Sequence, residues 1–180
     1  ANNDFLSFAN MKQAEKENII FKNNSELSDE EYIIETGEEI VIYSASPSGE
    51  LYALQTLKQI LFQCGGKIPH IRIKDYPAYK FRGFMLDAGR YFFSVDDVKS
   101  IIRRMVLHKL NVLHFHLTED QGWRIEIEKY PLLTKIGSSR KKTNFNHKPH
   151  SGFYTKQDIK EIVDYAHAFC IKVMSEFDIP

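Results

Sequence analysis

The second half of the chain repeats one pattern, an apolar segment followed by an amphipathic helical segment, and this repeat constrains the fold more than any other feature. The apolar segments are residues 81–87, 111–117 and 171–177. The pattern Ser94-x-x-Asp97 predicts a helix after the first segment, and Thr155-x-x-Asp158 predicts another before the third. Strands and helices that alternate in this way indicate parallel strands joined by right-handed crossovers.

The first part of the chain is organised differently. Its periodicity predicts a two-stranded hairpin, a helix and a further strand, over residues 32–35, 40–43, about 50–63 and 68–73. Pro77 breaks the pattern, and the charge balance changes there: 7 Lys and Arg against 12 Asp and Glu precede residue 78, whereas 17 against 12 follow. We therefore predict an α+β domain over residues 1–77 and an α/β domain over residues 78–180.

Composition excludes several classes of function. The 24 Lys and Arg residues equal the 24 Asp and Glu residues, so the chain lacks the overall positive field that binds nucleic acid. No segment approaches the roughly 18 consecutive apolar residues of a membrane-spanning helix. The first residues show no targeting pattern, and the localisation stays open. Cys64 and Cys170 lack the spacing of a disulfide framework or a zinc site, and we expect both to be small buried side chains.

Acidic side chains lie at the ends of all three predicted parallel strands. They are Asp87 in the first, Glu119 and Asp120 after the second, and Glu176 and Asp178 around the end of the third. Ligands bind at the carboxyl ends of the strands in barrels and in open α/β sheets. The shared position therefore favours a site over a purely structural use of these acids in turns and helix caps.

Arg90 follows Asp87 by three residues, and two interpretations of this pair remain open. A local ion pair would only steady the turn. In a binding site, the rigid fork of guanidinium donors would hold vicinal hydroxyls or a carboxylate, while Asp87 neutralises and orients it. A separate cluster of basic residues, 140–142 with His150 nearby, is expected to lie on the solvated surface.

The histidines and the tryptophan of this region also allow two interpretations each. His114 and His116 lie on one face of the second strand, as hydrogen-bonded interior groups or, with Glu176 or Asp178, as ligands of a metal ion. Trp123 either packs in the core or forms the wall of a sugar site, because its flat apolar face suits the C–H surface of a pyranose.

Four ordered motifs in the second half of the chain are specific enough to indicate a family. They are RGFMLDAGRYF at 82–92, KLNVLHFHLTEDQGWR at 109–124, GFYT at 152–155 and EFDIP at 176–180. In these motifs the chain resembles the start of the catalytic barrel of family 20 glycoside hydrolases, the β-N-acetylhexosaminidases. Residues 32–77 are similar to the small α+β domain that precedes this barrel. The resemblance implies an α+β domain followed by the first three β/α units of a TIM (β/α)8 barrel.

The resemblance also implies a reaction and a set of site residues. The reaction is hydrolysis of a glycan that ends in β-linked N-acetylglucosamine or N-acetylgalactosamine, with the substrate's own acetamido oxygen attacking the anomeric carbon. No metal or other cofactor is implied. We expect Arg90 and Asp120 to bind the substrate; Glu119 stands where the family usually has Asp. The residues expected to support the site are Asp87, His116, Glu119, Trp123, Glu176 and Asp178.

By the same resemblance, the chain carries only part of the family's site. The principal Asp-Glu pair of the family belongs to a fourth strand, beyond the position of Pro180, so we expect the 180-residue chain to be inactive by itself. The alternatives are a non-catalytic module that binds carbohydrate or a partner protein, and a metal-dependent hydrolase built on His114 and His116. Because open strand edges expose unpaired backbone groups, we also expect the isolated chain to self-associate.

Overall fold

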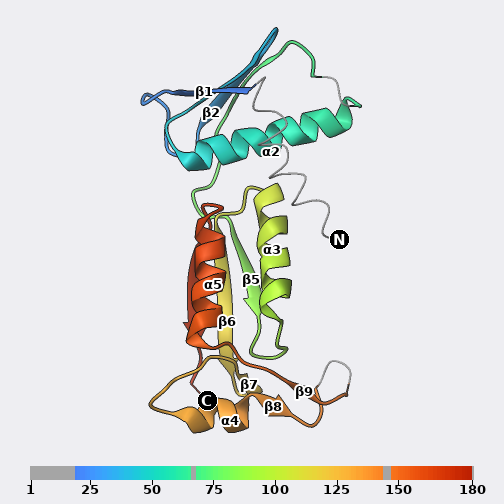
Figure 1. Cartoon of the computed structure of the whole chain (residues 1–180), viewed down its shortest axis with the longest axis vertical. Coiled ribbons are helices and arrows are strands. Elements are labelled where there is room, and N and C mark those ends of the chain that lie inside the picture. Colours follow the sequence, from blue (N-terminus) through green and yellow to red (C-terminus); the bar gives the residue numbers. More distant parts are fainter. Residues whose placement is uncertain (1–18, 66–67, 144–146, 180) are drawn as a thin grey trace. The chain divides into compact units, whose positions relative to one another are not determined.

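The chain divides into two compact units, residues 1–80 and 81–180 (Figure 1). The structure, a computed structural model, describes residues 19–65, 68–143 and 147–179. Residues 1–18 of the predicted first domain therefore lie outside the described residues. Within the described ranges, every helix is too short or too polar to cross a membrane.

In the described residues, the first unit consists of a four-stranded sheet and one long helix. Its elements are β1 (Ile19–Asn23), β2 (Tyr32–Thr36), β3 (Ile40–Ser44), α2 (Pro47–Gln63) and β4 (Arg72–Asp75). The strands lie in the order β1-β3-β2-β4, with β1 parallel to β3 and the other two pairs antiparallel. The predicted hairpin and helix are confirmed.

Two strands of this sheet differ from the prediction. β1 is not among the predicted strands, and the strand predicted over 68–73 is displaced to β4. Pro69 lacks a backbone N–H and cannot donate to a sheet ladder. The Thr36 hydroxyl instead donates to the carbonyl of Pro69 at 2.5 Å and accepts from the N–H of Ile71 at 2.8 Å. Where the strand was expected to begin, this side chain therefore adds to a single backbone hydrogen bond, from the Thr36 N–H to the Ile71 carbonyl at 3.0 Å.

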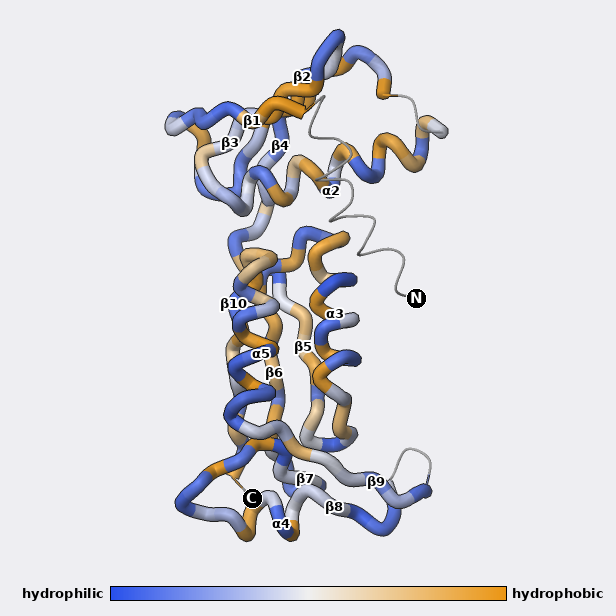
Figure 2. Tube along the Cα trace, viewed as in Figure 1, coloured by the Kyte–Doolittle hydropathy of each residue, from blue (hydrophilic) through white to orange (hydrophobic). Residues whose placement is uncertain are grey.

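The helix α2 packs an apolar stripe against this sheet. Ser46 caps its start, because the Ser46 hydroxyl accepts a hydrogen bond from the Gly49 N–H at 3.3 Å. Figure 2 shows apolar and polar residues alternating along the helix. Leu51, Leu54 and Leu57 are buried at helical spacing and face the strands β2 and β3. The core of the first unit thus lies between helix and sheet.

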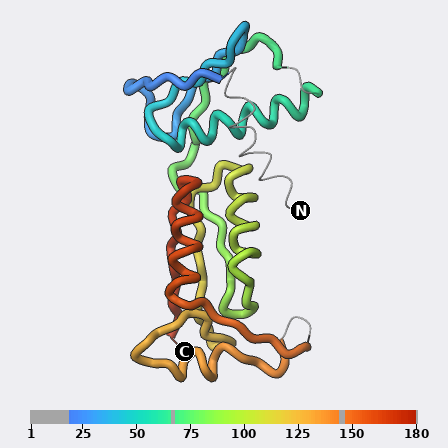
Figure 3. The backbone as a smooth tube through the Cα atoms, viewed as in Figure 1, coloured from blue at the N-terminus to red at the C-terminus, as the bar shows by residue number. Residues whose placement is uncertain are grey.

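The second unit contains three parallel strands and two long helices. They are β5 (Gly83–Asp87), α3 (Val95–Leu107), β6 (Val112–Glu119), α5 (Lys156–His167) and β10 (Lys172–Phe177). The strand order is β10-β6-β5, and both pairs are parallel. The colours of Figure 3 follow residue number and run through the second unit from green, at β5, to red, at α5. β10, late in the sequence, pairs with the earlier β6. The prediction of three parallel strands is confirmed.

Both long helices begin with the predicted capping boxes and pack against each other. Ser94 and Thr155 each accept from the N–H three residues later, and the aspartate there accepts from the N–H of the cap in return. Leu113, Phe115 and Leu117 alternate along β6 and are fully buried. Because side chains alternate between the two faces of a strand, His114 and His116 lie on the opposite face.

Between β6 and α5 the chain forms four short elements that the sequence analysis does not predict. They are β7 (Gly122–Trp123), α4 (Pro131–Gly137), β8 (Ser139–Arg140) and β9 (His150–Ser151). β7 folds back antiparallel on the end of β6, so that Trp123 pairs with Thr118. Two-residue strands and a seven-residue helix are too short to show a hydrophobic period.

A buried arginine joins the segments around these elements. Arg124 directly follows β7, and its side chain is fully buried. Its guanidinium donates to four backbone carbonyls at 2.6–3.2 Å, those of Ala88, Gly89, Ser138 and Gly152. Burial lowers the pKa of Arg124, and the nearby positive charge of Arg140 lowers it further. One side chain thus fixes the connections that follow β5, α4 and β9.

The expectation for the cysteines is wrong. Cys64 is exposed and Cys170 is half-buried, and both are free thiols. Cys64 is the C-cap of α2, and Cys170 lies in the turn before β10 with a positive φ of 57°. Both positions lie where a helix ends at the surface, which a count of cysteine spacings does not reveal.

Loss of a helix cap provides a first test of this fold. Ser94→Ala removes the hydroxyl that caps α3 and should lower the free energy of unfolding by about 1 kcal/mol. Ser100→Ala makes the same chemical change inside α3, where alanine is the better helix former, and should not destabilise. Chemical denaturation of the two variants measures the difference. Equal stability of the two variants would contradict the assigned start of α3.

Arg124 provides a second test. Arg124→Met removes the donor of the Ala88, Gly89 and Gly152 carbonyls, whereas the Ser138 carbonyl keeps the Gly152 N–H at 3.1 Å. The change should lower the free energy of unfolding by about 3 kcal/mol. Within the described residues, the side chain of Arg140 donates a single hydrogen bond, to the carbonyl of Asp120 at 2.8 Å. Arg140→Met is therefore the matched control and should cost less than about 1 kcal/mol. A similar loss of unfolding free energy in both variants, measured by chemical denaturation, would show that the hydrogen bonds of Arg124 stabilise the fold no more than the one from Arg140 does.

Candidate functional site

The predicted acidic residues meet where β5, β6 and β10 end. The parallel register places Asp87 of β5 and Glu176 of β10 on either side of His116 in β6. Glu119 ends β6, and Gly89 packs closely against it, since a Cβ at Gly89 would lie 2.9 Å from the Cβ of Glu119. The fold thus brings these side chains from three strands into one cluster.

Arg90 lies between two carboxylates of this cluster. Its Nη1 is 2.6 Å from Oδ2 of Asp87, and its Nη2 is 2.5 Å from Oε2 of Glu119. The Arg90 N–H also donates to Oδ1 of Asp87 at 3.0 Å. The side chain of Arg90 nevertheless remains 49% exposed. The local ion pair is therefore present, and it holds the guanidinium in place with donors still open to solvent.

Two histidines share the carboxylate of Glu176. Nδ1 of His116 and Nε2 of His114 each lie 2.6 Å from Oε2 of Glu176. His116 is 3% exposed, whereas His114 is half-buried. The other ring nitrogen of His116, Nε2, lies 3.5 Å from Oε2 of Glu119 and has no hydrogen-bond partner among the described residues. His116 thus lies between the carboxylates that end β6 and β10.

The charges of the cluster shift the pKa of both kinds of group. Burial raises the pKa of Asp87, but the hydrogen bonds from Arg90 outweigh it and hold that pKa below its ordinary value. Burial lowers the pKa of His116, but Glu176, Asp87 and Asp178 outweigh it and raise that pKa. The hydrogen bond from His116 in turn lowers the pKa of Glu176. The cluster therefore favours the ionised form of Asp87 and Glu176 and the protonated form of His116.

The metal interpretation meets an electrostatic objection. One atom each of His116, Glu119 and Asp178 lies within 4.8 Å of the others, close enough to surround a cation. However, Oε2 of Glu119 already pairs with Arg90 at 2.5 Å, and Nδ1 of His116 already contacts Glu176. A cation there would lie beside a guanidinium and would compete with it for the same oxygen. The contacts therefore favour an ion-pair network at this place.

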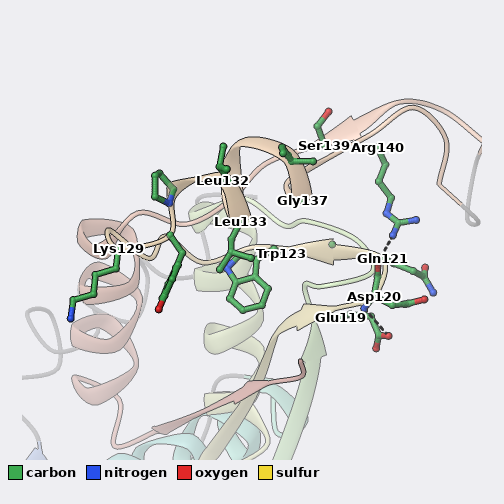
Figure 4. Close-up of a pocket in the computed structure, with 14 residues that line it drawn as sticks. Glu119, Asp120, Gln121, Trp123, Lys129, Leu132, Leu133, Gly137, Ser139 and Arg140 are labelled. Atoms are coloured by element: carbon green, nitrogen blue, oxygen red, sulfur yellow. Dashed lines mark hydrogen bonds between the residues drawn. The ribbon is translucent and has the colours of Figure 1, made fainter. Parts of the chain in front are cut away.

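A pocket of about 810 Å³ opens beside the cluster. Apolar side chains form most of its wall, namely Trp123, Tyr130, Pro131, Leu132, Leu133 and Ile136. Glu119 and Asp120 lie at one end of the pocket, as Figure 4 shows, with Arg140 next to them. Glu119 therefore belongs both to the Arg90 cluster and to the pocket.

The remaining predicted residues lie around this pocket and the strand ends. Trp123 is half-buried; its indole N–H donates to the carbonyl of Ile125 at 2.8 Å, and its ring lines the pocket. Asp120 is exposed in the turn between β6 and β7. Asp178 is also exposed, and its carbonyl accepts from the Thr118 hydroxyl at 2.8 Å. The structure thus places the whole predicted set at one end of the sheet.

Two residues have a larger role here than the sequence analysis assigns. Arg140, expected to be solvated surface, donates to the carbonyl of Asp120. His150 is half-buried; its ring stacks on Tyr91 with 3.9 Å between centroids, and its Nε2 accepts from the Phe92 N–H at 2.9 Å. Burial lowers the pKa of His150. His150 therefore fixes the segment that follows Arg90, which its place in a polar loop does not reveal.

Arg124 is the residue that the sequence analysis misses altogether. Its bonds to the carbonyls of Ala88 and Gly89 fix the backbone directly before Arg90. The only sequence signal is the neighbouring Gly122, where a Cβ would lie 2.6 Å from the carbonyl of Gly89 and 2.8 Å from the Arg124 guanidinium. The site is thus a fixed guanidinium among carboxylates, with donors and acceptors suited to the hydroxyls of a polar ligand.

Comparison with known families assigns both units of the chain. Residues 79–180 match the model of glycosyl hydrolase family 20, catalytic domain. Residues 5–76 match the model of glycosyl hydrolase family 20, domain 2. The two matches follow each other along the chain and together leave only a few residues unassigned.

Similar proteins carry the same family's names. A beta-hexosaminidase of Porphyromonas gingivalis is 42% identical over 164 residues, which is 86% of this chain and 21% of that protein. A beta-hexosaminidase of Vibrio furnissii is 37% identical over 172 residues, 90% of this chain and 28% of that protein. The chain thus spans between a fifth and a third of the length of these relatives.

Solved structures agree with the sequence matches. An exo beta-N-acetylglucosaminidase from Vibrio harveyi, solved with N-acetylglucosamine, superposes with a TM-score of 0.81 at 35% identity, over 90% of this chain and 27% of that one. A beta-N-acetylhexosaminidase from Bacteroides fragilis gives 0.79 at 39% identity, over 90% and 33%. Because a single family model also matches more than half of this chain, the chain belongs to glycosyl hydrolase family 20.

Proposed function

We propose that this chain supplies the N-terminal part of a β-N-acetylhexosaminidase, which hydrolyses terminal β-linked N-acetylglucosamine or N-acetylgalactosamine. The observation that carries the proposal is Arg90, fixed by Asp87 and Glu119 at the ends of parallel strands and still half exposed. Family membership and the beta-hexosaminidase names of the relatives support it. The substrate is then a glycan that ends in N-acetylhexosamine.

Arg90 is the main sugar-binding group in this proposal. A guanidinium presents its donors in one plane and can bond two neighbouring hydroxyls at once. The carboxylates of Asp87 and Glu119 hold two of its nitrogens, so little side-chain entropy is lost when the sugar binds. Asp120 accepts hydrogen bonds from the sugar at the exposed edge. The supporting residues are Asp87, His116, Glu119, Trp123, Glu176 and Asp178.

The three parallel strands are, in this proposal, the first three of a (β/α)8 barrel in a domain that covers residues 78–180 of this chain and follows an accessory domain of residues 1–77. The helices α3 and α5 pack against each other, as neighbouring outer helices of a barrel do. Met85 and Met174 lie beside His114 on the face away from the helices and are exposed. Such apolar positions suit the inside of a closed barrel.

The reaction that we propose is assisted by the substrate. The acetamido oxygen of the sugar attacks the anomeric carbon, and the glycosidic oxygen leaves with a proton from a carboxylic acid; water then opens the cyclic intermediate. By family resemblance an Asp-Glu pair holds the acetamido group and transfers the proton. The residues of this chain bind and orient the sugar through Arg90.

Activity of the whole protein tests the proposal. The protein as its gene encodes it should release the chromophore from a chromogenic β-N-acetylglucosaminide, whereas the 180-residue chain alone should not. A matched β-glucoside without the acetamido group should remain uncut, because the nucleophile of the reaction is then missing. Rapid cleavage of the β-glucoside, or turnover by the purified 180-residue chain, would contradict the proposed reaction and the proposed division of labour.

Replacement of Arg90 tests the assigned sugar contact. Arg90→Ala in the gene-encoded protein should weaken binding of N-acetylglucosamine, measured as a competitive inhibition constant, roughly tenfold to a hundredfold. Arg90→Lys keeps the charge but not the fork and should recover only part of the affinity. Arg104→Ala, at an exposed position in the last turn of α3, is the control. An unchanged constant in Arg90→Ala would remove Arg90 from the binding site.

A further inference from the structure

One buried nitrogen in the cluster is unexplained by the sugar contacts. Nε2 of His116 is buried without a hydrogen-bond partner in the described part of the chain, although the ring is only 3% exposed. A buried polar atom without a partner is costly, so such an atom calls for an explanation. Oε2 of Glu119 lies 3.5 Å from this nitrogen and is the same oxygen that pairs with Arg90.

The proton count of the ring explains how this nitrogen could act. A neutral imidazole has a single N–H. If this N–H is on Nδ1 and donates to Glu176, Nε2 points a lone pair toward the negatively charged Glu119 carboxylate. An imidazolium has an N–H on both nitrogens and attracts both carboxylates. The position of His116 between Glu176 and Glu119 therefore suits the charged form.

The surroundings of the ring also favour the charged form. Four carboxylates face it from three elements and their ends: Asp87 from β5, Glu119 from β6, Glu176 from β10 and Asp178 after it. The basic side chains nearby are Arg90, held by Asp87 and Glu119, and His114, which contacts Glu176. Negative charge therefore predominates around the ring.

We propose that His116 is a positioning residue for the sugar-binding arginine: its imidazolium bridges Glu176 and Glu119 and thereby fixes the carboxylate that holds one arm of Arg90. This inference rests on the proposed function, because it assumes that Arg90 binds the sugar. The chain of contacts runs from Glu176 through His116 to Glu119 and Arg90. Without the imidazolium, the Glu119 carboxylate has one positive partner fewer and holds Arg90 in less defined geometry.

A double-mutant cycle in the gene-encoded protein tests this role. His116→Phe should raise the inhibition constant of N-acetylglucosamine at least about tenfold when Arg90 is present. In the Arg90→Ala background the same change should raise it less than about threefold, because there is no guanidinium left to position. Equal factors in both backgrounds would show a merely structural role and overturn the inference. No effect of His116→Phe in either background would overturn it as well.

His114→Phe is the matched control, since it makes the same change on the same face of β6. His114 contacts the same oxygen of Glu176 but, in the described part of the chain, makes no ion pair or hydrogen bond with Glu119. It should therefore change the inhibition constant less than about threefold. An effect of His114→Phe as large and as dependent on Arg90 as that of His116→Phe would assign the role to Glu176 and overturn the inference for His116.

A pH series separates positioning from packing and covers the case in which the Phe variant fails to fold. The pKa of His116 lies above its ordinary value of 6.5, so the ring keeps its proton to a higher pH than an unperturbed imidazole and loses it as the pH rises through that raised pKa. The affinity of the wild type for the sugar should therefore fall as the pH rises through this pKa. His116→Gln keeps a donor that does not titrate, and the ratio of its inhibition constant to that of the wild type should fall as the pH rises. A pH-independent ratio would overturn the inference.

The same measurements distinguish failure of this inference from failure of the proposed function. If Arg90→Ala weakens sugar binding and His116→Phe does not, Arg90 binds the sugar and only the positioning role is wrong. If Arg90→Ala leaves the inhibition constant unchanged, the proposed sugar contact is wrong, and the positioning role is overturned with it.

Discussion

The candidate site depends first on the buried guanidinium of Arg124. Arg124 is fully buried and satisfies backbone carbonyls from the connections after β5, α4 and β9. These connections have little regular structure of their own. Arg124 supplies the donor for the carbonyls of Ala88 and Gly152, and it adds a second donor to the Ser138 carbonyl. Because Ala88 and Gly89 directly precede Arg90, the hydrogen bonds from Arg124 to their carbonyls fix the position of the Arg90 backbone. The buried Arg124 thus fixes the backbone from which the exposed Arg90 side chain extends.

Ion pairs with neighbouring carboxylates position the side chain of Arg90. Asp87 and Glu119 take two nitrogens of Arg90, and His116 lies between Glu119 and Glu176. Each carboxylate contacts at least one positive group, so the burial of this much charge at a sheet end is tolerated. The network crosses all three strands, which means that the parallel register and the site geometry depend on each other. A shift of register in β10 would remove Glu176 from His116 and leave the ring with one carboxylate partner fewer.

The sequence predicts the parts of this arrangement that local patterns determine. The capping boxes at Ser94 and Thr155, the three parallel strands, and the acids at the strand ends follow from spacing within a few residues. The contacts of Arg124 and His150 do not, because their partners are backbone groups up to 58 residues away. α4 and the two-residue strands are too short for periodicity, and the family resemblance rather than any spacing indicates the ligand. Local patterns thus predict the framework, and nonlocal backbone contacts decide how its loops are held.

Glu119 shows how one methylene can matter in such a network. By resemblance, the family usually has Asp at this position. The side chain of Glu119 places Oε2 2.5 Å from Nη2 of Arg90 and 3.5 Å from Nε2 of His116, while Oε1 accepts from the Asp120 N–H at 3.2 Å. An aspartate on the same backbone would end roughly 1.5 Å shorter, one C–C bond, and would not keep all three contacts at these distances. The longer side chain therefore lets this chain join Arg90, His116 and the β6–β7 turn through a single carboxylate, whereas an aspartate requires the strand end or the arginine to move closer.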